Sequence, residues 1–284
     1  MNSQIFQSIE AFRKYRSALK GKVAVVPTMG ALHEGHLSLV HQARTVADHV
    51  IMTIFVNPSQ FGPHEDFNKY PRTLENDVRL GQRAGVDCFF TPEVSEIYPE
   101  GYGTWVIPET PVCQKLEGAS RPGHFRGVTT VVLKLFNIIQ ADVAIFGRKD
   151  YQQCLIIRQM VRDLNIPIQL IEAPIHREPD GLAMSSRNRY LSTAEREYAL
   201  GIQRSMKLAK SLVLEEKKYN FSEIISVLHA EILTHSSVRL DYATFVDPET
   251  LEPQSHFEGQ TLFVAAVWVG KTRLIDNITI ESSK

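Results

Sequence analysis

The strongest constraint on the fold is a repeated succession of short apolar runs and helical patterns in the first 171 residues. Buried strands are predicted at residues 22–27, 49–57, 88–91, 143–147 and 168–171. Helical patterns lie between them, at about 34–48, 73–84, 127–140 and 152–164. Strand–helix–strand repetition predicts a parallel sheet with helices on both faces. The near-continuous apolar run at 49–57 is typical of a strand covered on both faces.

The pattern changes after about Glu172. Capping-box signals at residues 192–195 and 220–223 open helices that are expected to end near residues 216 and 235. Strands are expected at about 239–247, 260–269 and 273–280. We therefore predict an α/β protein with two domains. Residues 1–173 form a Rossmann-like, doubly wound parallel sheet, and residues 174–284 form a smaller α+β domain.

Composition and charge exclude several classes of protein. The 284 residues include 31 basic and 32 acidic side chains, a balance that argues against a dedicated nucleic-acid binder. The three cysteines, Cys88, Cys113 and Cys154, are odd in number and widely spaced, so they predict reduced thiols rather than disulfides or a zinc knuckle. Neither a signal peptide nor a run of the ~20 apolar residues that span a membrane is present. We expect a soluble, cytoplasmic protein.

The loop after the first buried strand, residues 27–36, contains the first polar cluster. Gly30 allows a tight turn, and His33 and His36 are spaced to share one face at the start of a helix. Two imidazoles and free backbone N–H groups at a helix N-terminus suit phosphate oxygens. The segment from His33 to His36 is one residue shorter than the zinc motif His-Glu-x-x-His. Two capping or surface histidines remain the alternative.

Two further clusters follow predicted strands. Asn57 and Gln60 could read hydroxyl and carboxylate groups of a small polar substrate, although Asn-Pro is also an ordinary turn former. Lys149 suits phosphate and Asp150 could accept from ribose hydroxyls. Gln153 would share a face with Lys149 if the helix has begun there. A solvated, charged turn is the alternative for this second group.

The fourth cluster lies just past the predicted domain boundary, at residues 180–188. Ser185, Ser186 and Arg187 offer two hydroxyls and a guanidinium in consecutive positions. Such a segment can surround phosphates and stabilise charge that develops during their displacement. A polar interdomain linker is the alternative.

Taken together, these segments resemble the pantothenate synthetase (pantoate–β-alanine ligase) family. It belongs to the nucleotidyltransferase group with a His-x-Gly-His-type signature and a Lys-Met-Ser-Lys-Ser-like loop. The matching stretches are residues 27–36, 55–61, 121–128, 147–153, 180–188 and 272–278. The resemblance implies ATP-dependent condensation of pantoate with β-alanine through a pantoyl adenylate, with release of AMP and diphosphate. It also implies Mg²⁺, for which the sequence assigns no ligand, and a homodimer.

The resemblance also implies roles for individual residues. His33, His36, Lys149 and Arg187 would act in catalysis. Gln60, Gln153 and Asn57 would bind pantoate, with Gln60 also beside β-alanine. The residues expected to bind ATP are Met29, Gly30, Ala31, Leu32, His33, Glu34, Gly35, His36, Gly147, Arg148, Lys149, Asp150, His176, Met184, Ser185, Ser186 and Arg187.

Two positions depart from the family pattern. Arg148 stands where the family typically has Glu, and His176 stands where a small apolar residue is common. Two other functions stay open at this point. One is a nucleotidyltransferase whose product retains the nucleotide, which the Gln60–Gln153 pair disfavours. The other is a noncatalytic nucleotide-binding regulator, which would be expected to lose its phosphate-contacting side chains.

Overall fold

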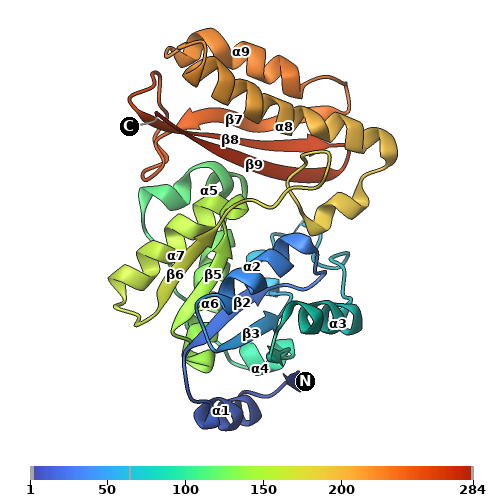
Figure 1. Cartoon of the computed structure of the whole chain (residues 1–284), viewed down its shortest axis with the longest axis vertical. Coiled ribbons are helices and arrows are strands. Elements are labelled where there is room, and N and C mark those ends of the chain that lie inside the picture. Colours follow the sequence, from blue (N-terminus) through green and yellow to red (C-terminus); the bar gives the residue numbers. More distant parts are fainter. Residues whose placement is uncertain (1–2, 64, 283–284) are drawn as a thin grey trace. The chain divides into compact units, whose positions relative to one another are not determined.

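A computed structural model of the chain describes residues 3–63 and 65–282 (Figure 1). The chain divides into two units. The first contains residues up to Arg148 together with Gln152–Pro174, and the second contains Lys149–Tyr151 together with the chain from Ile175 onwards. The predicted boundary after residue 173 did not anticipate that residues 149–151 would group with the second unit. No helix in the described ranges is long and apolar enough to cross a membrane.

The first unit is built on a six-stranded parallel sheet. Its strands are β1 (Gln4–Phe6), β2 (Val23–Thr28), β3 (His49–Ile54), β4 (Cys88–Phe90), β5 (Val143–Gly147) and β6 (Gln169–Ala173). Their order is β1-β4-β3-β2-β5-β6, and every adjacent pair is parallel. The order reverses between β2 and β5. Ligands of doubly wound sheets bind outside the carboxyl ends of the strands at such a reversal.

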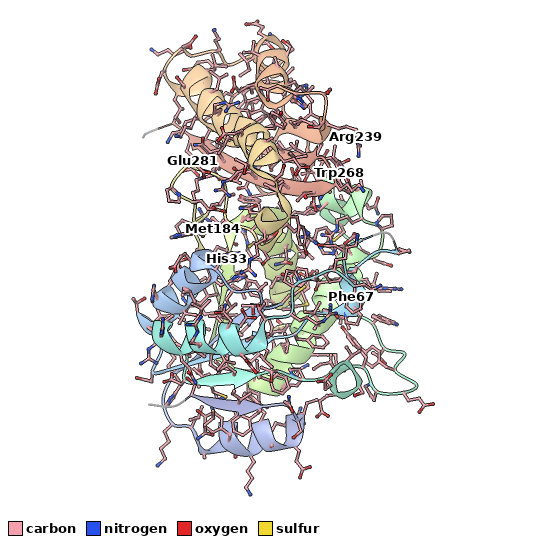
Figure 2. The ribbon with its side chains drawn as sticks, turned by 90° about the vertical axis from the view of Figure 1, so that its right-hand side faces the viewer. His33, Phe67, Met184, Arg239, Trp268 and Glu281 are labelled. Carbon is pink, nitrogen blue, oxygen red and sulfur yellow. The ribbon has the colours of Figure 1, made fainter. Side chains whose placement is uncertain are left out.

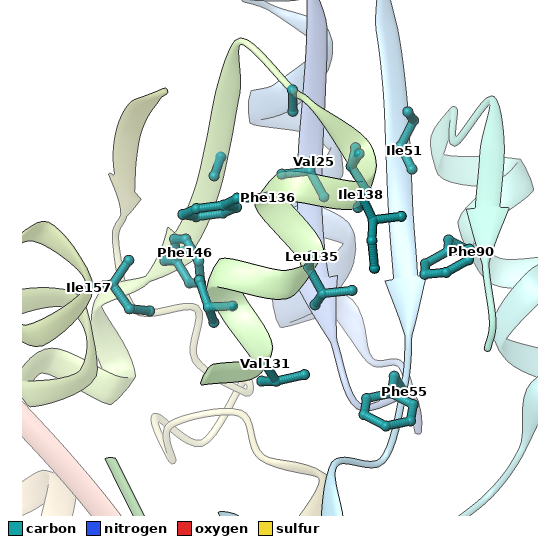
Figure 3. Packing of buried hydrophobic residues seen from close by; sticks show 14 of the residues in the cluster. Val25, Ile51, Phe55, Phe90, Val131, Leu135, Phe136, Ile138, Phe146 and Ile157 are labelled. Atoms are coloured by element: carbon teal, nitrogen blue, oxygen red, sulfur yellow. The ribbon is translucent and has the colours of Figure 1, made fainter. Parts of the chain in front are cut away.

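Helices cover both faces of this sheet, as predicted. They are α1 (Ile9–Ala18), α2 (Glu34–Arg44), α3 (Leu74–Ala84), α4 (Val94–Ile97), α5 (Leu116–Ser120), α6 (His124–Ile139) and α7 (Tyr151–Asp163). Figure 3 shows Leu135 and Ile138 of α6 against Val25 and Ile51 of the central strands. Val26, the next residue of β2, belongs to the core on the other face, because successive strand residues point to opposite sides.

The second unit contains an antiparallel sheet in the order β7-β8-β9 and two helices. The strands are β7 (Val238–Val246), β8 (Gln260–Val269) and β9 (Thr272–Glu281), and the helices are α8 (Thr193–Leu214) and α9 (Phe221–Ile232). Alternate residues of β8, including Phe263 and Val267, share a buried core with both helices. Figure 1 shows α8 and α9 on one face of this sheet. The predicted α+β domain is confirmed.

The two capping signals of this unit differ in detail. The Ser192 hydroxyl accepts the Glu195 N–H at 3.3 Å, and the Glu195 carboxylate accepts the Ser192 N–H at 2.9 Å, which confirms the predicted capping box. The Asn220 side chain instead accepts the N–H of Ser222 at 3.1 Å and donates to the Glu223 carboxylate at 2.8 Å. Both signals mark helix starts, but only the first forms the reciprocal pair.

Candidate active site

A buried carboxylate from α3 fastens the loop between β2 and α2. Asp77 is 0% exposed, and its two oxygens accept the N–H groups of Ala31 at 2.9 Å and Leu32 at 2.8 Å. The Thr73 hydroxyl donates to the same carboxylate at 3.0 Å. Gly30 has a φ of +81°, and a Cβ there would lie 3.0 Å from the Asp77 carboxylate, so this turn favours glycine. The expectation of free backbone N–H groups is wrong at Ala31 and Leu32, because both donate to Asp77.

Asp77 was missed by the sequence analysis, and its removal provides a test. Asp77→Asn is expected to lower the free energy of unfolding by about 2 kcal/mol. A carboxamide has one acceptor oxygen, so its NH₂ group would face one of the two backbone N–H groups and leave that donor without an acceptor. Urea unfolding measures this change. Glu75→Gln, on the same helix but at an exposed position, is the matched loss of charge and should have a much smaller effect. Equal midpoints for the two variants would contradict the role assigned to Asp77.

The two histidines lie together where α2 begins, and Figure 2 labels His33 at this end of the helix. Their ring centroids are 4.0 Å apart, and the His33 N–H lies 3.4 Å from His36 Nδ1. In this contact Nδ1 of His36 is the acceptor, so the neutral ring carries its proton on Nε2. The helix N-terminus contributes partial positive charge, which favours anions. The predicted pairing of the two rings is therefore present.

The side chain of Asn57 is directed into the protein. It is 1% exposed, and its oxygen accepts from the Ser59 hydroxyl at 2.8 Å and from the Tyr98 hydroxyl at 2.9 Å. Its nitrogen donates to Gln60 Oε1 at 3.0 Å and to the Gly127 carbonyl at 3.2 Å. The expected contact of Asn57 with a substrate is not supported by this arrangement. Asn57 instead supports Gln60, because its polar atoms are already engaged.

Gln60 connects the loops that follow β2 and β3. Its Nε2 lies 3.3 Å from Met29 Sδ, so residues predicted to bind different substrates are neighbours within the first unit. The 3-10 turn η1 (Pro58–Gln60) also packs closely on α6. A Cβ at Gly127 would lie 2.2 Å from the Ser59 carbonyl oxygen, so only glycine fits this contact. The glycine at 127, within the segment at 121–128, thus allows α6 to pack closely against the turn that carries Gln60.

Behind Gln60 lies a network that joins His124, the first residue of α6, to Arg121 and Glu65. His124 Nδ1 is 2.8 Å from the Gln60 carbonyl oxygen, and its Nε2 is 3.0 Å from an Arg121 guanidinium nitrogen. Arg121 also donates two hydrogen bonds to Glu65, at 2.9 and 2.7 Å. A carbonyl only accepts and a guanidinium only donates, so His124 carries its proton on Nδ1. Burial, together with the positive charge of Arg121, lowers the pKa of His124 to about 4.

This low pKa predicts acid sensitivity. The unfolded chain binds a proton at His124 near the ordinary value of 6.5, whereas the folded protein binds it only near pH 4. Stability from this group is present above pH 6.5 and is lost between 6.5 and about 4, by up to about 3 kcal/mol. Urea unfolding across this range should show a shallower pH dependence in His124→Gln. His41→Gln, at an exposed position, is the control; identical slopes in wild type and His124→Gln would contradict the assignment.

The segment after β5 differs from the expected helical start. Helix α7 begins at Tyr151, and Lys149 lies in the preceding 3-10 turn η3 (Arg148–Asp150), so the helical spacing assumed between Lys149 and Gln153 is absent. Lys149 Nζ lies 3.7 Å from the Asp150 carboxylate. Gln153 is half-buried in the first turn of α7.

Arg148, the charge-reversing departure, has an acidic neighbour. Its Nε lies 3.5 Å from the carboxylate of Glu172 on β6, and Arg158 lies 3.3 Å from the other oxygen of the same group. The side chain of Arg148 is half exposed. The added positive charge is therefore partly balanced within the first unit.

In the second unit, the segment before α8 forms a tight hairpin. Arg177 and Ala183 form an isolated antiparallel bridge, and the Met184 N–H donates to the His176 carbonyl at 3.0 Å. Gly181 has a φ of +97° at the turn. The side chain of His176, the second departure, is exposed, whereas its backbone carbonyl is engaged in the hairpin. Figure 2 labels Met184 at the end of this hairpin.

A short 3-10 turn, η4 (Ser186–Tyr190), follows the hairpin. The Ser185 hydroxyl caps it by accepting the Arg187 N–H at 3.2 Å. Ser186 is buried, whereas Ser185 and Arg187 are half-buried. Both hydroxyls suit phosphates equally well in the sequence, but the structure distinguishes them, because Ser185 caps a turn and Ser186 is in the interior.

The described residues contain no group of three or more His, Cys, Asp or Glu side chains that could hold a metal ion. The segment from His33 to His36 therefore does not form part of such a cluster within residues 3–63 and 65–282.

Comparison with known proteins identifies the family. The model of the pantoate-beta-alanine ligase family matches residues 4–279. The chain belongs to this family. The match begins at the start of β1, ends within β9, and includes all six stretches from 27–36 to 272–278.

Individual members of the family are similar over their full length. A pantothenate synthetase from Moorella thermoacetica is 51% identical over 281 residues, covering 98% of this chain and 99% of the relative. The crystal structure of a pantothenate synthetase from Thermus thermophilus has a TM-score of 0.92 and 43% identity, covering 97% and 98% of the two chains. A Francisella tularensis pantoate-beta-alanine ligase, complexed with beta-gamma ATP and beta-alanine, has a TM-score of 0.81 and 35% identity, with 97% of each chain covered.

The predicted site residues of this member of the pantoate-beta-alanine ligase family fall into two sets, one in each unit. The first unit contributes Met29, His33, His36 and Gln60 around the carboxyl ends of β2 and β3. The second unit contributes Lys149, Asp150 and the segment from Met184 to Arg187. These residues stay predictions from the sequence, and Asp77, Tyr98 and the contacts of His124 were not among them. Of the stretches that resemble the family, only residues 121–128 include His124.

Proposed function

We propose that this chain condenses pantoate with β-alanine at the expense of ATP, through a pantoyl adenylate, and releases AMP and diphosphate. The observation that carries the proposal is the family match over residues 4–279. The beta-gamma ATP and beta-alanine named for the Francisella tularensis relative support two of the three substrates. The chain would work in the cytoplasm as a homodimer.

In the first step, a carboxylate oxygen of pantoate attacks the α-phosphorus of ATP. The new P–O bond forms as the bond to the diphosphate breaks, and the diphosphate leaves with the electron pair. Both reactants are anions, so the protein must align them and stabilise the developing charge. We assign His36 Nε2–H as a donor to phosphate oxygens, since its Nδ1 accepts from His33. His33 would act beside it as a second donor.

In the second step, the amine of β-alanine attacks the activated acyl carbon. The acyl–oxygen bond to AMP breaks, AMP leaves with the electron pair, and the amine loses a proton. Gln60 and Gln153 would bind pantoate through amide groups, with Gln60 also beside β-alanine. The support given to Gln60 by Asn57 and by the Gln60 carbonyl contact with His124 suits a residue that must orient two substrates.

Further contacts with the phosphates of ATP would come from the segments at 147–150 and 184–187. Lys149 and Arg187 supply positive charge, and Ser185 and Ser186 supply donors. Residues 147–150 would contact ribose and phosphates, and the backbone at His176 would lie beside adenine. The exposed side chain of His176 is compatible with a contact made through the backbone.

Magnesium would enter as part of the Mg·ATP substrate. Mg²⁺ in such sites usually keeps several waters and is held by phosphates and one or two carboxylates. The described residues contain no cluster of three acidic, His or Cys side chains. The metal would be carried mainly by phosphate oxygens of the nucleotide.

The test uses the purified chain with ATP, pantoate and β-alanine. We expect pantoate-dependent exchange of labelled diphosphate into ATP, and AMP release at full rate only when β-alanine is added. The expected substrate is (R)-pantoate, and (S)-pantoate is the matched control. A diphosphate–ATP exchange rate that does not depend on pantoate would refute the proposal. A product that retains the nucleotide in the presence of β-alanine would indicate a nucleotidyltransferase.

A further inference from the structure

Strand β9 carries two consecutive buried polar residues in the second unit. Asp276 is 4% exposed and Asn277 is 6% exposed, although they lie in a largely apolar sheet. Buried polar groups are costly unless they are hydrogen-bonded, so their partners indicate what they do. Successive residues of a strand point to opposite faces, which lets these two residues reach different segments.

Asp276 fastens the hairpin that precedes the serine–arginine segment. Its two oxygens accept from the Arg177 guanidinium at 2.7 and 2.9 Å, a bidentate arrangement with defined geometry. The same guanidinium donates to the Gly181 carbonyl at 3.1 Å. Arg177 and Gly181 both belong to the hairpin that leads into Met184. Asp276 therefore determines where the segment from Met184 to Arg187 begins.

Asn277 contacts the backbone of Lys149, the other residue that is assigned to the phosphates. Its Nδ2 donates to the backbone carbonyl of Lys149 at 3.0 Å, across 128 positions of sequence. The bond restrains the main chain of Lys149 while leaving the ammonium group available for other contacts. In β9 itself, residues 272–281 pair with β8 along the whole strand, so the backbone carrying both side chains is well anchored.

We propose that Asp276 and Asn277 are positioning residues for the adenylation step, which jointly set the spacing between Lys149 and the Ser185–Arg187 segment. Neither residue touches substrate; each acts through a group that is assigned to the phosphates. The inference rests on the proposed function, because that function makes Lys149 and Arg187 partners of the triphosphate. Neighbouring Cα atoms on a strand are ~3.8 Å apart. Because Asp276 and Asn277 are adjacent, they hold the hairpin before Met184 and the backbone of Lys149 at a defined separation.

The test measures the two half-reactions separately in Asn277→Ala. We expect diphosphate–ATP exchange to fall about tenfold, the size expected for a lost hydrogen bond that aligns a charged group, with the KM for β-alanine unchanged. Asn277→Gln retains an amide donor and should give an intermediate rate. Asp241→Asn is the control: it weakens another arginine–aspartate pair of the same sheet, in which Arg273 donates twice to one Asp241 oxygen, at 3.0 and 2.7 Å, and it should leave exchange unchanged.

A double-mutant cycle separates positioning from simple stabilisation of the fold. If Asn277 acts through Lys149, then Asn277→Ala should have little further effect in a Lys149→Ala background. Additive losses would overturn the inference, as would normal exchange in both Asn277→Ala and Asn277→Gln. Failure of the wild-type chain to exchange at all would instead overturn the proposed function and this inference with it, so the two failures are distinguishable.

Discussion

Replacing His36 with asparagine is expected to lower the rate of diphosphate–ATP exchange by about a hundredfold or more, because one preorganised donor to a developing charge is typically worth a factor of about 10²–10³. Asparagine can present an oxygen near the position of Nδ1 and so retain the contact with the His33 N–H. It has no group at the position of Nε2. The variant therefore removes the proposed donor while retaining the local cap.

The complementary substitution is His36→Gln. A glutamine amide can place a donor near the position of Nε2 but leaves no acceptor at Nδ1, so we expect partial recovery of exchange relative to His36→Asn. Urea unfolding should give similar midpoints for the two variants, which excludes loss of the fold as the cause. Exchange by His36→Asn at a rate near that of the wild type would show that His36 is not the donor.

Loss of the Lys149 ammonium group should have the second largest effect. We expect Lys149→Ala to lower kcat/KM for ATP by about a hundredfold, because a preorganised group that stabilises developing charge typically contributes a factor of about 10²–10³. The substitution leaves the carbonyl of Lys149 and its bond from Asn277 in place. The loss of activity should therefore come from the missing positive charge and not from a displaced backbone.

Lys149→Arg and Lys207→Ala complete this experiment. Arginine keeps the charge but not the compact geometry of an ammonium group, so it should restore only part of the activity. Lys207 is exposed on α8, and its substitution should leave kcat/KM unchanged. Steady-state kinetics with varied ATP measure all three variants. Equal activity of Lys149→Ala and Lys207→Ala would remove Lys149 from the proposed mechanism.

Most of the regular structure was predictable because the strands of the first unit are buried on both faces. Continuous apolar runs such as Val23–Val26 identify the central strands without any further information. The edge strand β1 and helix α1 were missed. Two of the three residues of β1 are exposed and α1 buries only Phe12, so neither carries a strong hydrophobic pattern.

The candidate site was predicted to a different extent at each cluster. The histidines at 33 and 36 are close in sequence, and the helical start that pairs their rings is itself encoded locally. Asn57 was assigned to substrate because its position after a strand suited that role. Its burial depends on Tyr98 and Gly127, and these partners are far away in the chain.

The sequence by itself determined the alternation of strands and helices, the helix caps and the order of the polar loops, because these depend on neighbours a few residues apart. Only the tertiary structure decided which polar side chains face inward and act on other groups. Asp77, His124 and Asn277 bond to backbone atoms 45, 64 and 128 positions away. Such contacts form only when packing brings distant segments together, since no local pattern encodes the partner of a buried hydrogen-bonding group.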